Sequence, residues 1–341
     1  MENIISFPGL GIEGIKLNTV AFNLFGRDIA WYGIIITCGI IAGFMYAMYR
    51  AKFEKIREDD VLDLAIWVVI FAVIGARAYY VLTNLDSYKT FYDAIAIWNG
   101  GIAIYGAIIA GGLTIAIFSK IRKLNTLKLL DMASPGVMLG QVIGRWGNFV
   151  NAEAYGEMTE LPWRMGIQNA HHPETIYVHP TFLYESLWNL LGFIIINSFY
   201  TRKRFNGQIF LSYITWYGFG RMFIEGLRTD SLYVGSFRIS QVVGFACFVI
   251  GSLLLIAFSL KSKLNRGTAN LTKADAALYE IDGGKHKAGE TYEKSDLDTD
   301  SACADDSSAD DLSGEGKTEV TEETGKNAET QGGKDQDGKA D

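Results

Sequence analysis

The sequence predicts an all-α polytopic membrane protein with about seven transmembrane helices and a disordered acidic tail. Three observations predict it: long apolar runs, basic residues confined to alternate connections, and a change of composition near residue 267. Of the 341 residues, 49% are hydrophobic, although the segment after residue 266 is strongly polar. We therefore expect a membrane-embedded domain over residues 1–266 and a tail over residues 267–341.

The apolar runs follow one another from residue 30 onward, and several are about the length that crosses ~30 Å of hydrocarbon. They cover residues 30–49, 61–83, 101–118, 132–144, 180–199, 207–224 and 238–260. The fourth run is short and contains Pro135, so we expect a broken or partly re-entrant helix there. Residues 1–29 are mixed in character, which indicates short strands or an interfacial segment.

The connections between the runs predict the orientation. Basic residues gather after the first, third, fifth and seventh runs, whereas the alternate connections hold few of them. By the positive-inside rule, this pattern places the N-terminus outside and the C-terminus in the cytoplasm. Residues 145–179 and 225–237 then lie on or near the outer face.

Charge divides the chain into the same two parts. Up to residue 266 there are 23 Lys and Arg against 18 Asp and Glu, whereas from residue 267 there are 8 against 20. The tail has almost no large apolar residues and cannot bury enough surface to fold. In the body, the basic residues form short clusters between apolar runs without a continuous basic face, so no nucleic-acid partner is expected.

Cysteine and histidine residues do not form a recognisable ligand pattern. Cys38 and Cys247 lie in apolar runs, and Cys303 lies in the tail. Neither a disulfide framework nor a zinc spacing is present. We expect no metal site.

The candidate site centres on residues 144–156, which lie between two apolar runs and carry an arginine, two asparagines and a glutamate. Ionisable groups at the edge of hydrocarbon are costly and are usually paired and functional. The glycines allow tight turns and a close approach to a ligand. A polar loop with one structural ion pair is the alternative. The residues concerned are Arg145, Asn148, Asn151, Glu153, Gly144, Gly147 and Gly156.

A second signal lies in the sixth run, where Tyr217, Arg221, Glu225 and Arg228 are spaced four, four and three apart. On a helix this spacing forms one face. Arg221 and Glu225 could simply neutralise each other, but two arginines against one glutamate leave a positive excess. Because guanidinium forks match phosphate oxygens, the stripe predicts an intramembrane site for an anionic, phosphate-bearing lipid headgroup.

Four further polar residues lie inside the apolar body. Arg77 is deep in the second run and needs a partner, for which a structural ion pair and a phosphate contact are both open. Tyr32 belongs either to an aromatic interface belt or to the site. Tyr105 is the polar side chain in the upper third of the third run. Glu185 lies one turn into an apolar run, where a carboxylate needs a cation nearby.

Several of these residues together resemble one known family, the prolipoprotein diacylglyceryl transferases. The resemblance covers residues 1–262, and its Gly-Arg-x-Gly-Asn-Phe-x-Asn-x-Glu element is highly specific. The matching segments are Trp31-Tyr32-Gly33, Trp98-Asn99-Gly100-Gly101, residues 144–153, His179-Pro180, Tyr184-Glu185, and Arg221 with Glu225 and Arg228.

The resemblance implies a multi-pass enzyme of the bacterial inner membrane with its active site toward the outer face. Such enzymes move the diacylglyceryl group of phosphatidylglycerol to the lipobox cysteine thiol of a prolipoprotein. A thioether forms and glycerol phosphate leaves. No metal or redox cofactor is implied. Many relatives carry a histidine in the third helix, where this chain has Tyr105, so the base could be Tyr105, a neighbouring carboxylate or water.

We expect Arg145 and Arg221 to hold the phosphate, with support from Arg77 and Arg228. The predicted catalytic residues are Arg145, Arg221, Tyr105 and Glu153. The predicted phosphatidylglycerol-binding residues are Arg145, Asn148, Asn151, Gly156, Tyr32, Arg77, Tyr217, Glu225 and Arg228. A lipid or anion transporter is the main alternative, although no internal repeat is evident. An intramembrane protease is a weaker one, because no helix-borne pair of aspartates and no Gly-x-Ser-Gly with a partner histidine is found.

Overall fold

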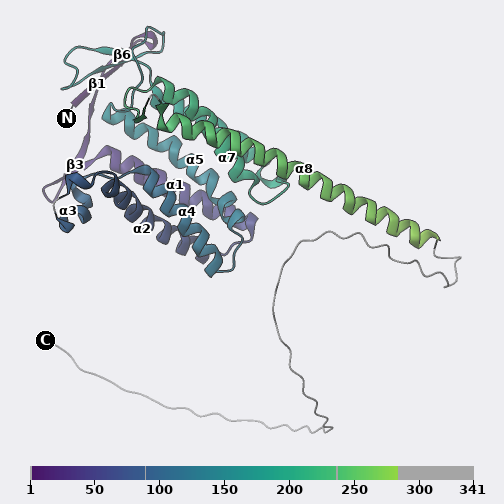
Figure 1. The fold of residues 1–341 in the computed structure, drawn as a ribbon. Helices are drawn as coiled ribbons and strands as arrows, with labels where there is room; N and C mark the ends of the chain where they lie inside the picture. Colours follow the sequence, from purple (N-terminus) through teal and green to yellow (C-terminus); the bar gives the residue numbers. More distant parts are fainter. Residues whose placement is uncertain (1, 89, 236, 283–341) are drawn as a thin grey trace, which may run out of the picture. The chain divides into compact units, whose positions relative to one another are not determined.

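The computed structural model describes residues 2–88, 90–235 and 237–282 (Figure 1). Long helices dominate this part of the chain. They are α1 (Trp31–Glu54), α2 (Glu58–Thr83), α4 (Ile104–Ile121), α5 (Thr126–Asn151), α6 (Thr181–Phe199), α7 (Gln208–Ile224) and α8 (Ile239–Asp282). In five helical segments, based on α1, α2, α4, α6 and α8, length and apolar composition suffice to cross a membrane. The protein is therefore a mostly helical membrane protein.

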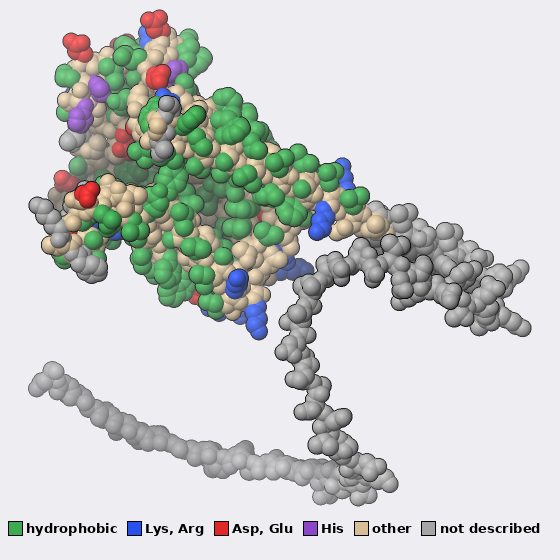
Figure 2. All heavy atoms as spheres, in the orientation of Figure 1, with side chains coloured by type: hydrophobic (Ala, Val, Ile, Leu, Met, Phe, Trp, Pro, Cys, Tyr) green, Lys and Arg blue, Asp and Glu red, His purple; other side chains and the backbone are tan. Residues whose placement is uncertain are grey.

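On the face shown in Figure 2, hydrophobic side chains cover most of the helix surface. Exposed apolar residues such as Ile40 on α1, Ile70 on α2 and Leu253 on α8 are 44–62% accessible in the isolated chain. Hydrocarbon covers such a surface favourably, whereas water does not. The apolar runs predicted these helices because lipid-facing helices must be apolar around much of their circumference.

The fourth run does not form the broken or re-entrant helix that was expected. Helix α5 is continuous from Thr126 to Asn151, with Pro135 inside it. It packs against α1, α4, α6 and α7. Its first and last turns contain polar residues that lie outside the apolar run, which is why the run underestimated the length of α5.

Close helix crossings are built from glycine. A Cβ added to Gly43 of α1 would lie 2.7 Å from the carbonyl oxygen of Gly136 on α5. The same distance would separate a Cβ on Gly75 of α2 from the carbonyl oxygen of Gly106 on α4. Any side chain at these positions would push the helices apart, so the glycines act as the small residues of membrane helix packing.

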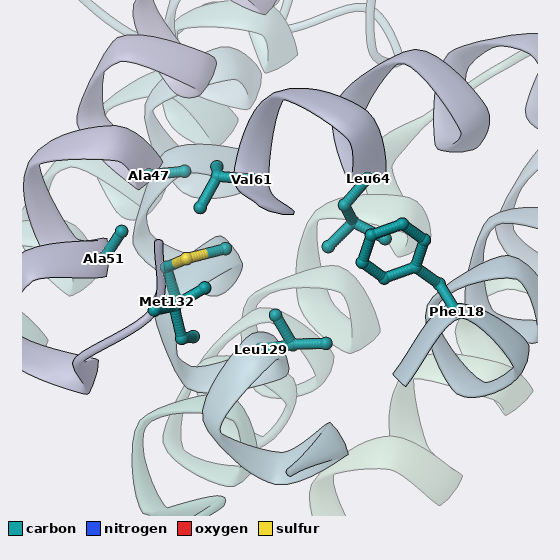
Figure 3. Close-up of a cluster of buried hydrophobic side chains, with 8 residues drawn as sticks. Ala47, Ala51, Val61, Leu64, Phe118, Leu129 and Met132 are labelled. Carbon is teal, nitrogen blue, oxygen red and sulfur yellow. The ribbon is translucent and has the colours of Figure 1, made fainter. Parts of the chain in front are cut away.

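The end of the bundle that carries the basic connections has its own core. Apolar side chains from α1, α2, α4 and α5 meet there (Figure 3). Beside them, Lys203 Nζ lies 2.6 Å from Glu54 Oε1 and 2.8 Å from Asp131 Oδ2. Asp131 also accepts hydrogen bonds from the backbone N–H groups of Gly207 and Phe210 at the start of α7. These buried pairs connect α1, α5 and α7 at the end opposite residue Asn151.

The all-α class was too narrow, because the chain also forms strands; the expectation of short strands within residues 1–29 is confirmed. An antiparallel sheet has the order β2-β1-β5-β6, and two separate hairpins pair β3 with β4 and β7 with β8. The strands are β1 (Glu2–Phe7), β2 (Ile12–Asn18), β3 (Val20–Leu24), β4 (Arg27–Ala30), β5 (Met165–Gln168), β6 (Ile176–Val178), β7 (Tyr233–Val234) and β8 (Phe237–Arg238). Short helical turns are η1 (Pro8–Leu10), η2 (Leu85–Ser87), α3 (Phe91–Ile95), η3 (Ile97–Asn99), η4 (Tyr200–Arg202) and η5 (Glu225–Leu227).

The four-stranded sheet is tied to the end of α5 that carries the candidate site. Ile5 of β1 pairs with Ile167 of β5, and both are fully buried. Their cluster includes Phe182 of α6 and Ala152 just after α5. The Asn3 amide donates to the carbonyl oxygen of Val150 at 2.9 Å. The sheet thereby braces the segment that follows α5.

The expected domain boundary at residue 266 does not coincide with the end of a helix. Helix α8 continues to Asp282. Residues 283–341 of the predicted tail lie outside the described residues.

Ending the chain after Asp282 should leave specific activity nearly unchanged. The reason is that every predicted site residue precedes that point. Initial transfer rates at equal membrane abundance test this expectation, with a chain ended after Arg266 as the comparison. A large loss in the first variant would contradict it, whereas a loss confined to the second would assign the effect to the end of α8.

Candidate active site

Three arginines from different parts of the chain meet one buried carboxylate. Glu185, on α6, is 4% exposed. Its Oε2 lies 2.6 Å from Arg145 Nη2 of α5, and its Oε1 lies 2.9 Å from Arg221 Nη1 of α7. Arg228 Nη1 is 3.5 Å from the same Oε1. Two oxygens of one carboxylate therefore hold the Arg145 and Arg221 guanidiniums side by side, as a site for two anionic oxygens requires.

Two more carboxylates complete what we call the Glu185 cluster, namely Glu185, Arg145, Arg221, Arg228, Glu225 and Asp230. Arg221 Nη2 lies 2.6 Å from Glu225 Oε2. Arg228 forms two hydrogen bonds to Asp230, at 2.9 Å and 2.7 Å. The expected positive excess is therefore wrong, because three arginines face three carboxylates among the described residues. Each guanidinium still has N–H donors beyond those that the carboxylates use.

The Arg228–Asp230 pair stays ionised around neutral pH. Burial acts to raise the pKa of the Asp230 carboxyl, but hydrogen bonds and charge from Arg228 outweigh it and hold that pKa below its usual value. Burial likewise acts to lower the pKa of Arg228, and Asp230 and Glu185 more than reverse this effect. Arg228 is thus a fixed positive charge at the rim of the cluster.

A pair of tryptophans fixes α6 against α7. Trp188 and Trp216 stack with ring centroids 4.3 Å apart, and each indole N–H donates to the backbone carbonyl oxygen of the other, at 3.0 Å and 2.9 Å. A Cβ at Gly192 or Gly220 would lie within 2.3 Å of an indole nitrogen. The tryptophan pair fixes the position of α6 relative to α7. Because Glu185 is one turn before Trp188 on α6, this packing also brings Glu185 to Arg221.

A small cavity adjoins the cluster between α6 and α7. Glu185, Asn189, Tyr217 and Arg221 are among its lining residues. Asn189 is 2% exposed, and its Oδ1 has no hydrogen-bond partner within the described residues. Buried acceptors are nearly always satisfied, so the cavity offers a position for a polar hydrogen-bond donor. Tyr217 also lines this small cavity.

The segment after α5 carries the rest of the predicted site. Arg145 Nη1 donates to Asn148 Oδ1 at 3.3 Å, and the Asn148 amide donates to Glu153 Oε1 at 2.8 Å. Ala152 and Ala154, on either side of Glu153, adopt positive φ of 49° and 56°. Such conformations cost roughly 1–3 kcal/mol each and cluster at functional sites. Glu153 is exposed, and within the described residues its hydrogen-bonded link to the cluster runs through Asn148.

The glycines of residues 144–156 do not make the turn that was expected of them. Gly144 and Gly147 lie within α5, and the turn falls on the two alanines instead. Gly147 leaves room for Tyr32, whose ring would be 2.9 Å from an added Cβ. Tyr32 thus packs beside the Arg145-bearing turn.

Gly156 and Asn151 have different surroundings. A Cβ at Gly156 would lie 2.7 Å from His179 Cβ and 3.0 Å from the Leu227 carbonyl oxygen, and Gly156 bridges to Arg228 through the backbone. Its role here is close packing beside the cluster. Asn151 is the last residue of α5, and within the described residues its side chain makes no hydrogen bond.

Arg77 is not brought into the Glu185 cluster. Its guanidinium donates to four backbone carbonyl oxygens, those of Asp93, Ala94, Gly100 and Gly101, at 2.5–2.8 Å. Within the described residues no hydrogen bond or ion pair joins it to the cluster. Within the described residues, the backbone of the α2–α4 connection therefore supplies the partner that Arg77 needs.

Tyr105 lies near the start of α4, and its hydroxyl is 3.1 Å from Ser240 Oγ of α8. One turn further along α8, a Cβ on Gly244 would lie 3.2 Å from Arg221 Cβ. Ser240 and Gly244 share one helix face. The contact therefore places Tyr105 on the side of α8 that adjoins Arg221, without bonding it to the cluster.

Replacing Tyr105 by phenylalanine should lower the initial rate by about tenfold, or about 1.4 kcal/mol of barrier. A hydroxyl that only positions a neighbour gives a loss of this size, whereas loss of an obligatory base costs on the order of 10²–10⁴. The measurement is the initial rate across pH 6–9, with lipid binding measured separately. Tyr92→Phe, an exposed tyrosine on the α2–α4 connection, is the control. A loss beyond a hundredfold at unchanged lipid affinity would make Tyr105 the proton acceptor.

Sequence reasoning noted that Glu185 needs a cation but did not place it in the site. Its isolated position in an apolar run was the available signal. The tryptophan pair was missed because its partners are set by tertiary packing. Asp230 was missed although its partner Arg228 is only two residues earlier. Glu225 was expected on the same helix face as Arg221 and Arg228; α7 in fact ends at Ile224, and η5 carries Glu225. The contacts nevertheless join all three.

These features define a class: a helical membrane protein whose buried arginine–carboxylate cluster lies at one end of the helix bundle. A family model described as prolipoprotein diacylglyceryl transferase matches residues 19–257. The chain belongs to the prolipoprotein diacylglyceryl transferase family. It is a transferase of lipoprotein biosynthesis and catalyses the first step of lipoprotein maturation.

Three similar proteins bear the name phosphatidylglycerol–prolipoprotein diacylglyceryl transferase. The protein of Finegoldia magna is 48% identical over 244 residues, which is 71% of this chain and 96% of the relative. That of Acaryochloris marina is 47% identical over 232 residues, or 66% and 85%. That of Listeria innocua is 43% identical over 258 residues, or 73% and 91%.

Proposed function

We propose that this enzyme transfers the diacylglyceryl group of phosphatidylglycerol to the lipobox cysteine thiol of prolipoproteins. The names of its relatives support these substrates. The observation that carries the proposal is the placement of the Arg145 and Arg221 guanidiniums on the two oxygens of Glu185. That arrangement presents two planar donors, from two different helices, to a phosphate.

In the reaction, the thiolate sulfur attacks the carbon of the diacylglycerol unit that is bonded to a phosphate oxygen. A carbon–sulfur bond forms as the carbon–oxygen bond breaks, and glycerol phosphate leaves with the bonding pair. Charge grows on the phosphate oxygen, where preorganised donors act most strongly. Arg145 and Arg221 supply these donors through N–H groups that their carboxylate partners do not use. Arg228 adds a fixed positive charge at the rim.

The thiol must lose its proton before attack, because the thiolate is the nucleophile. The proton goes to one of three acceptors: Tyr105, a carboxylate near the cluster, or water. Glu153 is the exposed carboxylate closest to Arg145 in the hydrogen-bond chain through Asn148. The Tyr105→Phe measurement separates the first acceptor from the other two.

The remaining predicted residues position the lipid. Asn148 and Glu153 would contact the glycerol headgroup, Tyr32 and Tyr217 would line its cavity, and Glu225 would orient Arg221 through their ion pair. Asn151 and Gly156 shape the adjoining turn. Arg77 acts at a distance, because it fixes the α2–α4 connection rather than contacting phosphate.

We further propose seven membrane crossings, in which α5 and α7 join the five candidate spans. Both are packed against other helices, so neither needs the apolar surface that a lipid-facing helix does. The basic connections then face the cytoplasm, and the N-terminus and the Glu185 cluster face outward. This topology suits an enzyme of the bacterial plasma membrane that meets its protein substrate at the outer face.

The test is mass spectrometry of a lipobox peptide incubated with the purified enzyme and phosphatidylglycerol. A diacylglyceryl mass increment on the cysteine, with release of glycerol phosphate, is the expected result. A peptide with serine in place of the cysteine is the matched control. Movement of intact lipid between vesicle leaflets, without glycerol phosphate release, would instead support a lipid transporter and overturn the proposal.

A further inference from the structure

The hairpin of β3 and β4 has one apolar and one polar face. Its register places Phe22 opposite Ile29 and Leu24 opposite Arg27, whereas Asn23 lies opposite Asp28. Directly paired residues share a face, and successive residues alternate between faces. One face therefore carries Phe22, Leu24, Ile29 and Arg27. The other carries Asn23 and Asp28, whose side chains are hydrogen-bonded at 2.8 Å.

Among the described residues, none covers the apolar face. Phe22 is 50% exposed and Leu24 is 48% exposed, and Phe25 at the tip is 97% exposed. Phe25 and Gly26 both have positive φ, 51° and 78°. Turns of this kind favour Asn or Asp before the glycine, since a bulky residue is strained there. A phenylalanine that is both fully exposed and in this strained backbone conformation is energetically unfavourable in water.

The hairpin directly precedes a candidate membrane-spanning helix, α1. Strand β4 ends at Ala30 and α1 begins at Trp31, and the Trp31 N–H donates to the Thr19 carbonyl oxygen at 3.0 Å across the base of the hairpin. Strand β3 and α3 lie at the same end of the helices (Figure 1). The α2–α4 connection there exposes Tyr92 and Trp98 by 67% and 66%. Such aromatics are typical of the membrane–water boundary.

We propose that the β3–β4 hairpin lies in the membrane interface, with Phe22, Leu24 and Phe25 inserted at the boundary between headgroups and acyl chains. Three observations select lipid as the occupant. The hairpin leads directly into α1, whose exposed residues include many apolar side chains. Arg27 on the apolar face suits lipid phosphates, and Asn23 and Asp28 lie on the opposite face. A two-stranded hairpin is also marginally stable alone in water, so an apolar cover is needed.

The test places an environment-sensitive fluorophore on single-cysteine variants, with Cys38, Cys247 and Cys303 replaced by serine. Phe25→Cys and Phe22→Cys report on the hairpin. Leu10→Cys is the matched control, because Leu10 is also an exposed apolar residue before a positive-φ glycine but lies in η1, on the four-stranded sheet. Each labelled full-length protein is placed in nanodiscs of phosphatidylglycerol and phosphatidylcholine, with and without brominated acyl chains.

The expected result is blue-shifted emission at positions 25 and 22 that brominated lipid quenches, and solvent-like, unquenched emission at position 10. Solvent-like emission at both hairpin positions, in variants that retain transferase turnover, would overturn the proposal. A synthetic lipobox peptide is then added. If positions 25 and 22 become protected only with the peptide, the hairpin binds peptide and the lipid assignment is wrong.

Discussion

Replacing Arg221 or Arg145 by alanine is expected to abolish measurable transfer while leaving membrane insertion intact. Removal of one preorganised electrostatic contact to a developing charge costs on the order of 10²–10³ in rate. Both guanidiniums are bonded to Glu185 and lie side by side, so either change also leaves its neighbour without a second donor for the same phosphate.

Lysine should rescue little at position 221. Arg221 uses Nη1 toward Glu185 and Nη2 toward Glu225, on two different elements. A single ammonium lacks the planar fork that spans both carboxylates. Initial rates with a lipobox peptide, together with thermal unfolding, measure the effect. Arg57→Ala, an exposed arginine at the opposite end of the bundle, is the matched control and should be near normal. Near-normal turnover of either site variant would remove that arginine from the mechanism.

The helices could be predicted from sequence because hydrocarbon imposes a strong local rule on lipid-facing segments. The rule fails for α5, where Arg145 pairs with Glu185 of α6 instead of facing hydrocarbon. It also does not predict the pairing of β1 with β5, because most of the membrane-spanning sequence lies between these two strands along the chain. Strand pairs of that separation depend on the tertiary fold, so the all-α expectation missed them.

The site was predictable where its residues are close in sequence. Arg221 and Glu225 are one helical turn apart and do form an ion pair. Arg77 shows the limit of this reasoning, because a buried arginine needs a partner but the sequence does not say which. Backbone carbonyl oxygens satisfied it here. Likewise, the convergence of three arginines on Glu185 depends on how α5, α6 and α7 pack.

Replacing Glu185 by glutamine should lower kcat by a factor on the order of 10² or more and reduce the free energy of unfolding by about 3–5 kcal/mol. The reason is that three guanidiniums lose the buried carboxylate that neutralises their mutual repulsion and fixes their positions. Glu185 acts as a positioning residue, through the arginines it holds. The freed guanidiniums keep their charge, so binding of the anionic lipid should not weaken. The expected signature is a fall in kcat with an unchanged or lower KM for phosphatidylglycerol.

The control for this variant is Glu157→Gln. Glu157 is also paired with an arginine, Arg238, at 3.4 Å, but its side chain is 60% exposed. Exposed pairs contribute little, so that variant should keep normal kinetics and stability. Thermal unfolding of both variants, measured in the same lipid, separates lost stability from lost turnover. If Glu185→Gln is destabilised yet retains a normal kcat at a temperature where it is folded, the carboxylate braces the bundle and does not position Arg145 and Arg221 for transfer.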